Sequence, residues 1–162
     1  MDRIPFQELI LQYNSISYVD LIFLEKFPSL ELLNLQGNQI KSVAKSMEDS
    51  APFSSLLHLD LSNNQLHFLH SFVLSDFPSL RYLNLSHNDI HTIAEDCFLL
   101  PSLQVMDLSH NRLTEAGQHF FDTSPSLRKV HLSHNVISRL TGLLSTNLLE
   151  YLLLLIAFII SF

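Results

Sequence analysis

Residues 80–90 read Leu-Arg-Tyr-Leu-Asn-Leu-Ser-His-Asn-Asp-Ile. Large apolar residues stand at the first, fourth, sixth and last positions of this stretch, and Asn88 stands between the last two. Leu83 and Leu85 are separated by one residue, and this alternation is typical of a short strand with one buried face. The stretch therefore predicts a strand, followed by a turn that carries an asparagine.

The same pattern recurs along the chain as L-x-x-L-x-L-x-x-N-x-L, where L is any large apolar residue. Its six copies begin at Phe6, Leu30, Leu56, Leu80, Leu103 and Leu127. Successive template asparagines lie 23 to 26 residues apart. Six copies in one register cannot be coincidental, so the chain is a repeat protein.

A repeat of this length can form one coil of a solenoid, with its strand about 4.8 Å from the strand of the next coil. Each coil buries its leucines only against its neighbours, so stability builds along the stack. We predict a right-handed solenoid over residues 1–142, with a parallel sheet on its concave face. The return segments, which contain apolar residues such as Val19 and Val43 and are interrupted by proline, are predicted as irregular or 3₁₀ turns on the convex face.

The template asparagine follows from the same geometry. Where the chain turns inward after each strand, backbone N–H and C=O groups lose their ladder partners, and an asparagine side chain offers both a donor and an acceptor. We therefore expect a structural, non-catalytic ladder formed by Asn14, Asn38, Asn64, Asn88, Asn111 and Asn135.

This pattern, from Phe6 to about Leu140, resembles the leucine-rich-repeat family. The spacing near 24 resembles the typical subclass of extracellular receptor and adhesion proteins, such as Toll-like receptors and chaoptin-like proteins. The resemblance implies partner recognition on the concave strands. It does not imply a particular ligand.

Residues between the buried leucines should point outward and form the binding face. Tyr82 is the strongest anchor candidate, because tyrosine and arginine are enriched at binding hot spots. The predicted partner-binding residues are His58, Asp60, Arg81, Tyr82, Asn84, Asp107, Lys129 and His131.

Two further patterns follow from the repeat. The Ser-His-Asn triplets should align His87, His110 and His134 about 5 Å apart, but no acidic or thiol residue joins this column, so no metal site is expected. Asn84-Leu85-Ser86 has the form of a glycosylation sequon, which the repeat template generates by itself.

Composition narrows the class of partner. The chain has 9 basic and 16 acidic residues and a formal net charge of −7, whereas a nucleic-acid-binding protein needs a basic stripe to neutralise phosphates. We found no phosphate-binding loop, metal cluster or nucleophile motif. The sequence thus predicts a protein ligand, no nucleic acid, no cofactor and no enzymatic activity.

The last residues leave two interpretations open. Residues 143–162 are strongly apolar, with Glu150 as their single charge. They read either as a membrane segment, which would favour a membrane-associated and possibly cell-surface receptor or adhesion protein, or as a degenerate seventh repeat. The N-terminal residues lack the apolar core of a secretion signal, so an intracellular, cytoplasmic scaffold or regulatory protein is the alternative.

Overall fold

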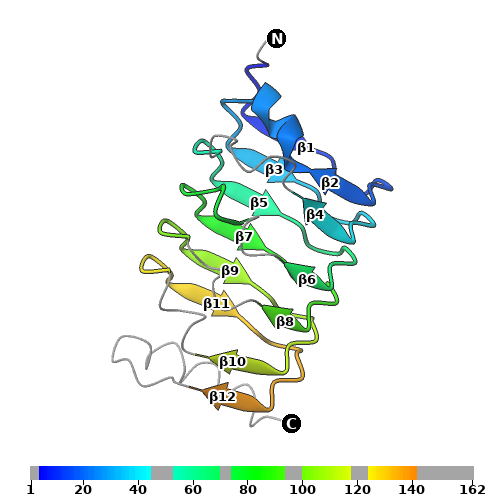
Figure 1. The fold of residues 1–162 in the computed structure, drawn as a ribbon, viewed down its shortest axis with the longest axis vertical. Helices are drawn as coiled ribbons and strands as arrows, with labels where there is room; N and C mark the ends of the chain where they lie inside the picture. The colour runs from blue at the N-terminus through cyan, green and yellow to red at the C-terminus, as the bar shows by residue number, and fades with distance from the viewer. Residues whose placement is uncertain (1–3, 45–52, 70–73, 94–99, 118–123, 142–162) are drawn as a thin grey trace.

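The computed structural model describes residues 4–44, 53–69, 74–93, 100–117 and 124–141. Over these residues the chain winds as a solenoid whose coils follow one another from the N-terminal end to the C-terminal end (Figure 1). Residues 143–162, and with them the choice between a membrane segment and a seventh repeat, lie outside the described residues.

Six short strands form the main sheet. They are β1 (Glu8–Ile10), β3 (Leu32–Asn34), β5 (His58–Asp60), β7 (Tyr82–Asn84), β9 (Val105–Asp107) and β11 (Lys129–His131), in that spatial order. Each strand pairs in parallel with the strand of the next coil, and equivalent template positions are in register. The predicted leucine-rich solenoid with one parallel sheet is confirmed.

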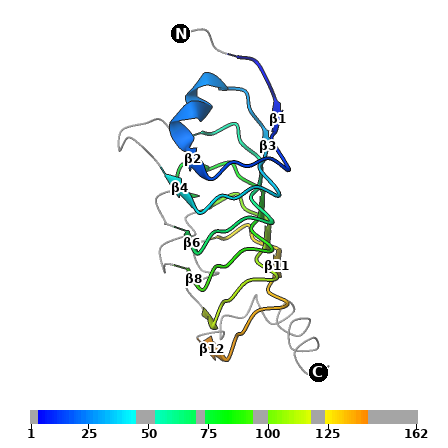
Figure 2. The same ribbon diagram turned by 90° about the vertical axis from the view of Figure 1, so that its right-hand side faces the viewer.

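The opposite side of each coil also contains short strands. They are β2 (Tyr18–Asp20), β4 (Ser42–Ala44), β6 (Phe68–Leu69), β8 (Thr92–Ile93), β10 (Glu115–Gly117) and β12 (Arg139–Thr141), which pair as β2–β4, β6–β8 and β10–β12. Figure 2 shows them across the solenoid from the main sheet.

The prediction of irregular or 3₁₀ turns was therefore incomplete for the segments around Val19 and Val43. Only one 3₁₀ helix, η1 (Leu21–Lys26), is present in the described part of the chain. Stacking of coils of similar length brings equivalent extended segments side by side. Their free backbone groups then pair in parallel as well, as in the Val19–Val43 register.

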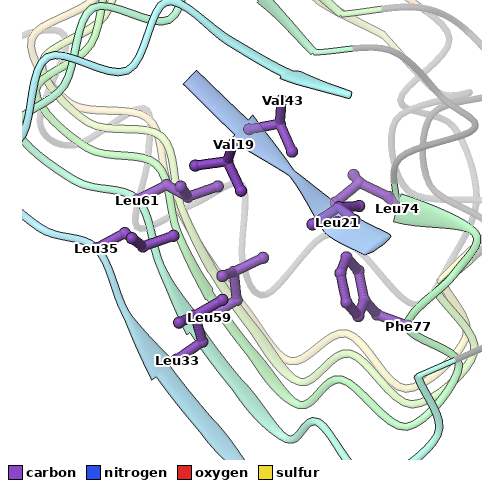
Figure 3. Close-up of a pocket in the computed structure, with 9 residues that line it drawn as sticks. All are labelled: Val19, Leu21, Leu33, Leu35, Val43, Leu59, Leu61, Leu74 and Phe77. Carbon is purple, nitrogen blue, oxygen red and sulfur yellow. The ribbon is translucent and has the colours of Figure 1, made fainter. Parts of the chain in front are cut away.

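Between the two sets of strands lies a continuous apolar core. Leu33, Leu59, Leu83 and Met106 occupy the middle of four successive main-sheet strands and are at most 3% exposed. Figure 3 shows how side chains from the two sides meet in the interior. The residues drawn there are Val19, Leu21, Leu33, Leu35, Val43, Leu59, Leu61, Leu74 and Phe77.

Asparagine side chains connect neighbouring coils through backbone groups. Asn88 Nδ2 donates to the carbonyl of Leu85 in its own coil at 3.1 Å and to that of Leu61 in the preceding coil at 3.0 Å. Asn88 Oδ1 accepts from the amide of Leu66 at 3.0 Å. Equivalent bonds to the preceding coil are made by Asn38, Asn64, Asn111 and Asn135.

Asn14 differs from the other five template asparagines. Its side chain is exposed and donates to Leu11 and Gln12 in its own coil, at 3.1 and 3.3 Å. It lies in the first coil that the structure describes, so the preceding-coil carbonyl that the other asparagines bind is not present in the described chain.

Candidate binding surface on the main sheet

Two columns of side chains point outward from the main sheet, and we call them together the open face. The first column contains Glu8, Leu32, His58, Tyr82, Val105 and Lys129, and the second contains Ile10, Asn34, Asp60, Asn84, Asp107 and His131. The alternation of side chains along each strand places these residues opposite the buried leucines. Most of them are exposed or half-buried.

Tyr82 lies in the middle of the open face and is half-buried. Its ring is 6.0 Å from the ring of His58 on the neighbouring strand, with the two planes tilted by 36°. Burial raises the pKa of the Tyr82 phenol, and the carboxylates of Asp60 and Asp107 raise it further. The hydroxyl therefore stays protonated at neutral pH and is available as a hydrogen-bond donor.

Asp60, Asn84 and Asp107 occupy equivalent positions on three adjacent strands. Asn84 Nδ2 donates to Asp60 Oδ2 at 3.2 Å, which links two of the three strands through side chains. Asn84 Oδ1 also accepts a hydrogen bond from the Ser86 hydroxyl at 2.8 Å. The sequon therefore lies on the open face, and the nitrogen that a glycan would modify is already engaged with Asp60.

A second role of these three residues was missed in the sequence. Each accepts a hydrogen bond from the backbone amide two residues later: Asp60 from Ser62 at 2.8 Å, Asn84 from Ser86 at 3.1 Å and Asp107 from Ser109 at 2.9 Å. Asn34 makes the same bond to the Gln36 amide at 3.0 Å. The signal was present, because an Asx residue at a strand end commonly closes a turn in this way.

The remaining predicted residues surround this centre. His58 is exposed beside Tyr82, whereas Arg81 precedes β7 and is exposed just outside the strand. Lys129 and His131 lie on β11, in register with Val105 and Asp107. The structure thus brings His58, Tyr82 and the Asx residues into one patch and places the basic residues of β11 on the strand beyond β9.

A separate column of histidines follows the strand ends. The rings of His87 and His110 are 4.0 Å apart, and those of His110 and His134 are 4.1 Å apart. Their planes differ by 10° and 14°, so the three imidazoles are stacked and lie closer together than the predicted spacing of about 5 Å.

Three further observations concern the described residues outside the open face. The interior void of Figure 3 is lined by hydrocarbon side chains, which offer a substrate no polar group. Among the described residues, no three histidine, cysteine or acidic side chains come together in a way that could hold a metal ion. Within the same part of the chain, no helix has the length and apolar character needed to cross a membrane.

Comparison with known proteins agrees with this architecture. A sequence profile described as a leucine-rich repeat matches residues 44–90 and 101–154, which is more than half of the chain. The chain belongs to the leucine-rich-repeat family. No curated protein sequence matches it.

Among solved structures, the solenoid is similar to the TLR13–ssRNA13 complex, with a TM-score of 0.66 and 24% identity over 88% of this chain and 23% of that one. It is also similar to the leucine-rich-repeat domain of APL1B, with a TM-score of 0.61 and 22% identity over 83% of this chain and 50% of that one. These likenesses establish the fold. This leucine-rich-repeat chain spans half or less of the length of either structure.

Proposed function

We propose that this leucine-rich-repeat chain is a non-enzymatic module that binds a protein partner on the open face. The observation that carries the proposal is the patch around Tyr82, where an aromatic ring, an imidazole and three Asx side chains lie on three adjacent strands. A face already formed by the sheet avoids the ordering entropy that a flexible binder loses.

The charge of this patch favours a protein over a nucleic acid. Asp60 and Asp107 both place negative charge near the Tyr82 hydroxyl, and the whole chain carries a formal net charge of −7. Phosphate groups would be repelled from such a surface. One similar structure is a complex of TLR13 with ssRNA. That ligand is a property of TLR13, and the negative charge of the present patch argues against an RNA ligand for this chain.

A binding role also fits the shape of the surface better than catalysis does. Catalytic groups usually work in an enclosed pocket that excludes water. The candidate residues instead lie on the outward side of a sheet, and the void inside the solenoid is lined only by hydrocarbon.

Site-specific photocrosslinking tests the proposed surface. A photoreactive phenylalanine analogue at Val105, which is in register with Tyr82, should crosslink to a protein, and Tyr82→Ala should reduce the yield. The matched control places the same analogue at Thr92 on β8, across the solenoid, and should give no such product. A nucleic-acid adduct at position 105, or equal protein adducts at both positions, would contradict the proposal.

We further propose that the chain acts as part of a membrane-associated receptor or adhesion protein, through residues 143–162. The support is their largely apolar composition, in which Glu150 is the only charged residue. The tagged full-length chain should stay with membranes after alkaline extraction, and a variant with Leu153→Asp and Ile156→Asp should be released. If the unmodified chain and the variant were both released from the membrane fraction, an intracellular scaffold would be favoured instead.

A further inference from the structure

The stacked histidines lie outside the binding patch and have no part in the proposed function. His87, His110 and His134 are all exposed, and each stands three residues after an open-face residue at the end of its strand. Their rings form one nearly parallel stack that joins three successive coils.

The backbone fixes this alignment. The three residues share the same left-handed conformation, with φ of 54°, 54° and 55°. The His87 amide donates to the Ser109 carbonyl at 3.0 Å and the His110 amide donates to the Ser133 carbonyl at 2.9 Å. Identical backbone geometry in adjacent coils points the side chains the same way, so the rings meet face to face.

Few charged groups other than the three histidines themselves act on this stack. Asp107 is the acidic group that favours protonation of His110, and its Oδ1 atom is held by the Ser109 amide and hydroxyl at 2.9 and 2.6 Å. Asp89 and Arg112 each follow directly after a template asparagine, and they neutralise each other in an ion pair of 2.8 Å.

In the neighbouring coil on the N-terminal side, Asp60 lies three residues before the position that is equivalent to the histidines, and that position itself is uncharged. Asn63 occupies the equivalent position there, with the same left-handed conformation at a φ of 53°. On the open-face side, three residues before each histidine, stand Asn84, Asp107 and His131.

We propose that the His87–His110–His134 stack is a pH-sensitive element that joins three coils when uncharged and separates when mild acid protonates it. Flat neutral imidazoles at this distance gain contact energy, whereas two protonated rings at the same distance repel each other even across water. Because each histidine follows a strand of the open face, acid should loosen the edge of the binding surface along the last three strands.

The direction of titration agrees with this geometry. Desolvation lowers the pKa of His110, the charges of His87 and His134 lower it further, and Asp107 partly opposes them. A lowered pKa means that the folded chain binds fewer protons than the unfolded chain. Folding stability is then complete above the ordinary histidine pKa of about 6.5 and declines as the pH falls toward the lowered value.

Histidine titration by NMR on the full chain tests the proposal. The ring resonances of the three residues should titrate as a coupled set, with His110 protonated last. In His87→Asn, which copies the residue found at position 63, the midpoint of His110 should move to higher pH, because the charge of His87 lowers the pKa of His110. His91→Gln, a change at an exposed histidine outside the stack, should leave that midpoint in place.

Thermal unfolding gives a second, independent measurement. The unfolding temperature of the unmodified chain should fall between about pH 7.5 and pH 5, and His110→Asn should lessen this fall while His91→Gln should not. Independent one-proton curves for all three histidines in the unmodified chain would overturn the proposal without any variant. An equal acid-induced fall in all three proteins would also overturn it.

Discussion

The asparagine at the turn is the residue that most directly holds one coil to the next. Asn88 is 8% exposed and satisfies a carbonyl and an amide of the preceding coil as well as a carbonyl of its own. Replacing Asn88 with alanine should lower the free energy of unfolding by about 1–3 kcal/mol, because those backbone groups would be buried without partners.

Chemical denaturation measures this loss. Asn14→Ala is the matched control, because Asn14 is exposed and bonds only within its own coil. It should cost clearly less than Asn88→Ala. Equal effects of the two substitutions would mean that the bonds between coils do not contribute to stability.

Tyr82, unlike Asn88, should contribute more to binding than to stability, since its ring lies on the surface and not in the core. Tyr82→Ala should leave the fold intact and weaken binding of the crosslinked partner by roughly 2 kcal/mol, about thirtyfold in Kd, as for a buried interface anchor. Tyr82→Phe keeps the ring beside His58 and should retain most of the affinity. Titration calorimetry measures the affinity of each variant, and circular dichroism checks its fold. If Tyr82→Ala unfolded the chain, the assignment of Tyr82 to the binding surface would be wrong.

The turn after each strand shows how one template position constrains the chain at the scale of an element. Tyr13, Asn63, His87, His110 and His134 all have positive φ at this position, and Gly37 has a φ of 66°. Most side chains disfavour this conformation, whereas asparagine tolerates it.

Gly37 is therefore a sensitive point in the second coil. A Cβ atom there would lie 2.5 Å from Cδ1 of the exposed Tyr13 ring. Gly37→Ala should destabilise the chain by about 1–2 kcal/mol through the left-handed backbone, whereas Gly37→Asn should cost less. In a Tyr13→Ala background the steric part should disappear while the backbone part remains. Thermal melts compare the unmodified chain with Gly37→Ala, Gly37→Asn, Tyr13→Ala and the double variant Tyr13→Ala/Gly37→Ala. Equal tolerance of alanine and asparagine at position 37 would contradict a backbone cause.

At this scale, the sequence was most informative where a physical requirement repeats. The alternation around Leu83 and the template asparagines sufficed to predict the main sheet and the position of each turn. The strands around Val19 and Val43 were not predicted, because they are only three residues long and arise only when neighbouring coils pair. The Asx bonds of Asp60 and Asp107 were not predicted either. An outward side chain at a strand end can bind a partner or accept from the backbone amide two residues later, and only the first role was assigned to these residues.

At the scale of the whole molecule, a solenoid gains its stability from contacts between neighbouring coils. A side chain in a central coil has neighbours on both sides, whereas one in an end coil has fewer. Leu83, which is 0% exposed in the fourth strand of the main sheet, and the half-buried Leu9 in the first strand occupy the same template position.

Leu83→Ala should accordingly cost about 2–5 kcal/mol of unfolding free energy, through the lost contacts and the cavity left behind. Leu9→Ala should cost less, because its side chain is already partly accessible. Denaturant titration of both variants compares the two positions. A larger loss at Leu9 would contradict a stack stabilised by neighbouring coils.

Binding should likewise use the main sheet as one continuous surface that several coils build together. The patch spans β5, β7 and β9, so a partner must contact several coils at once, and the short strands across the solenoid should take no part. The two sides can be distinguished in one experiment, because both contain backbone amides that exchange with solvent.

Hydrogen exchange of the chain, alone and with the crosslinked partner, tests this claim most directly. We expect the partner to slow exchange in peptides that cover residues 56–60, 80–84 and 103–107, and to leave those that cover β4 and β8 unchanged. Protection confined to β4 and β8, with unchanged exchange around Tyr82, would contradict recognition on the open face.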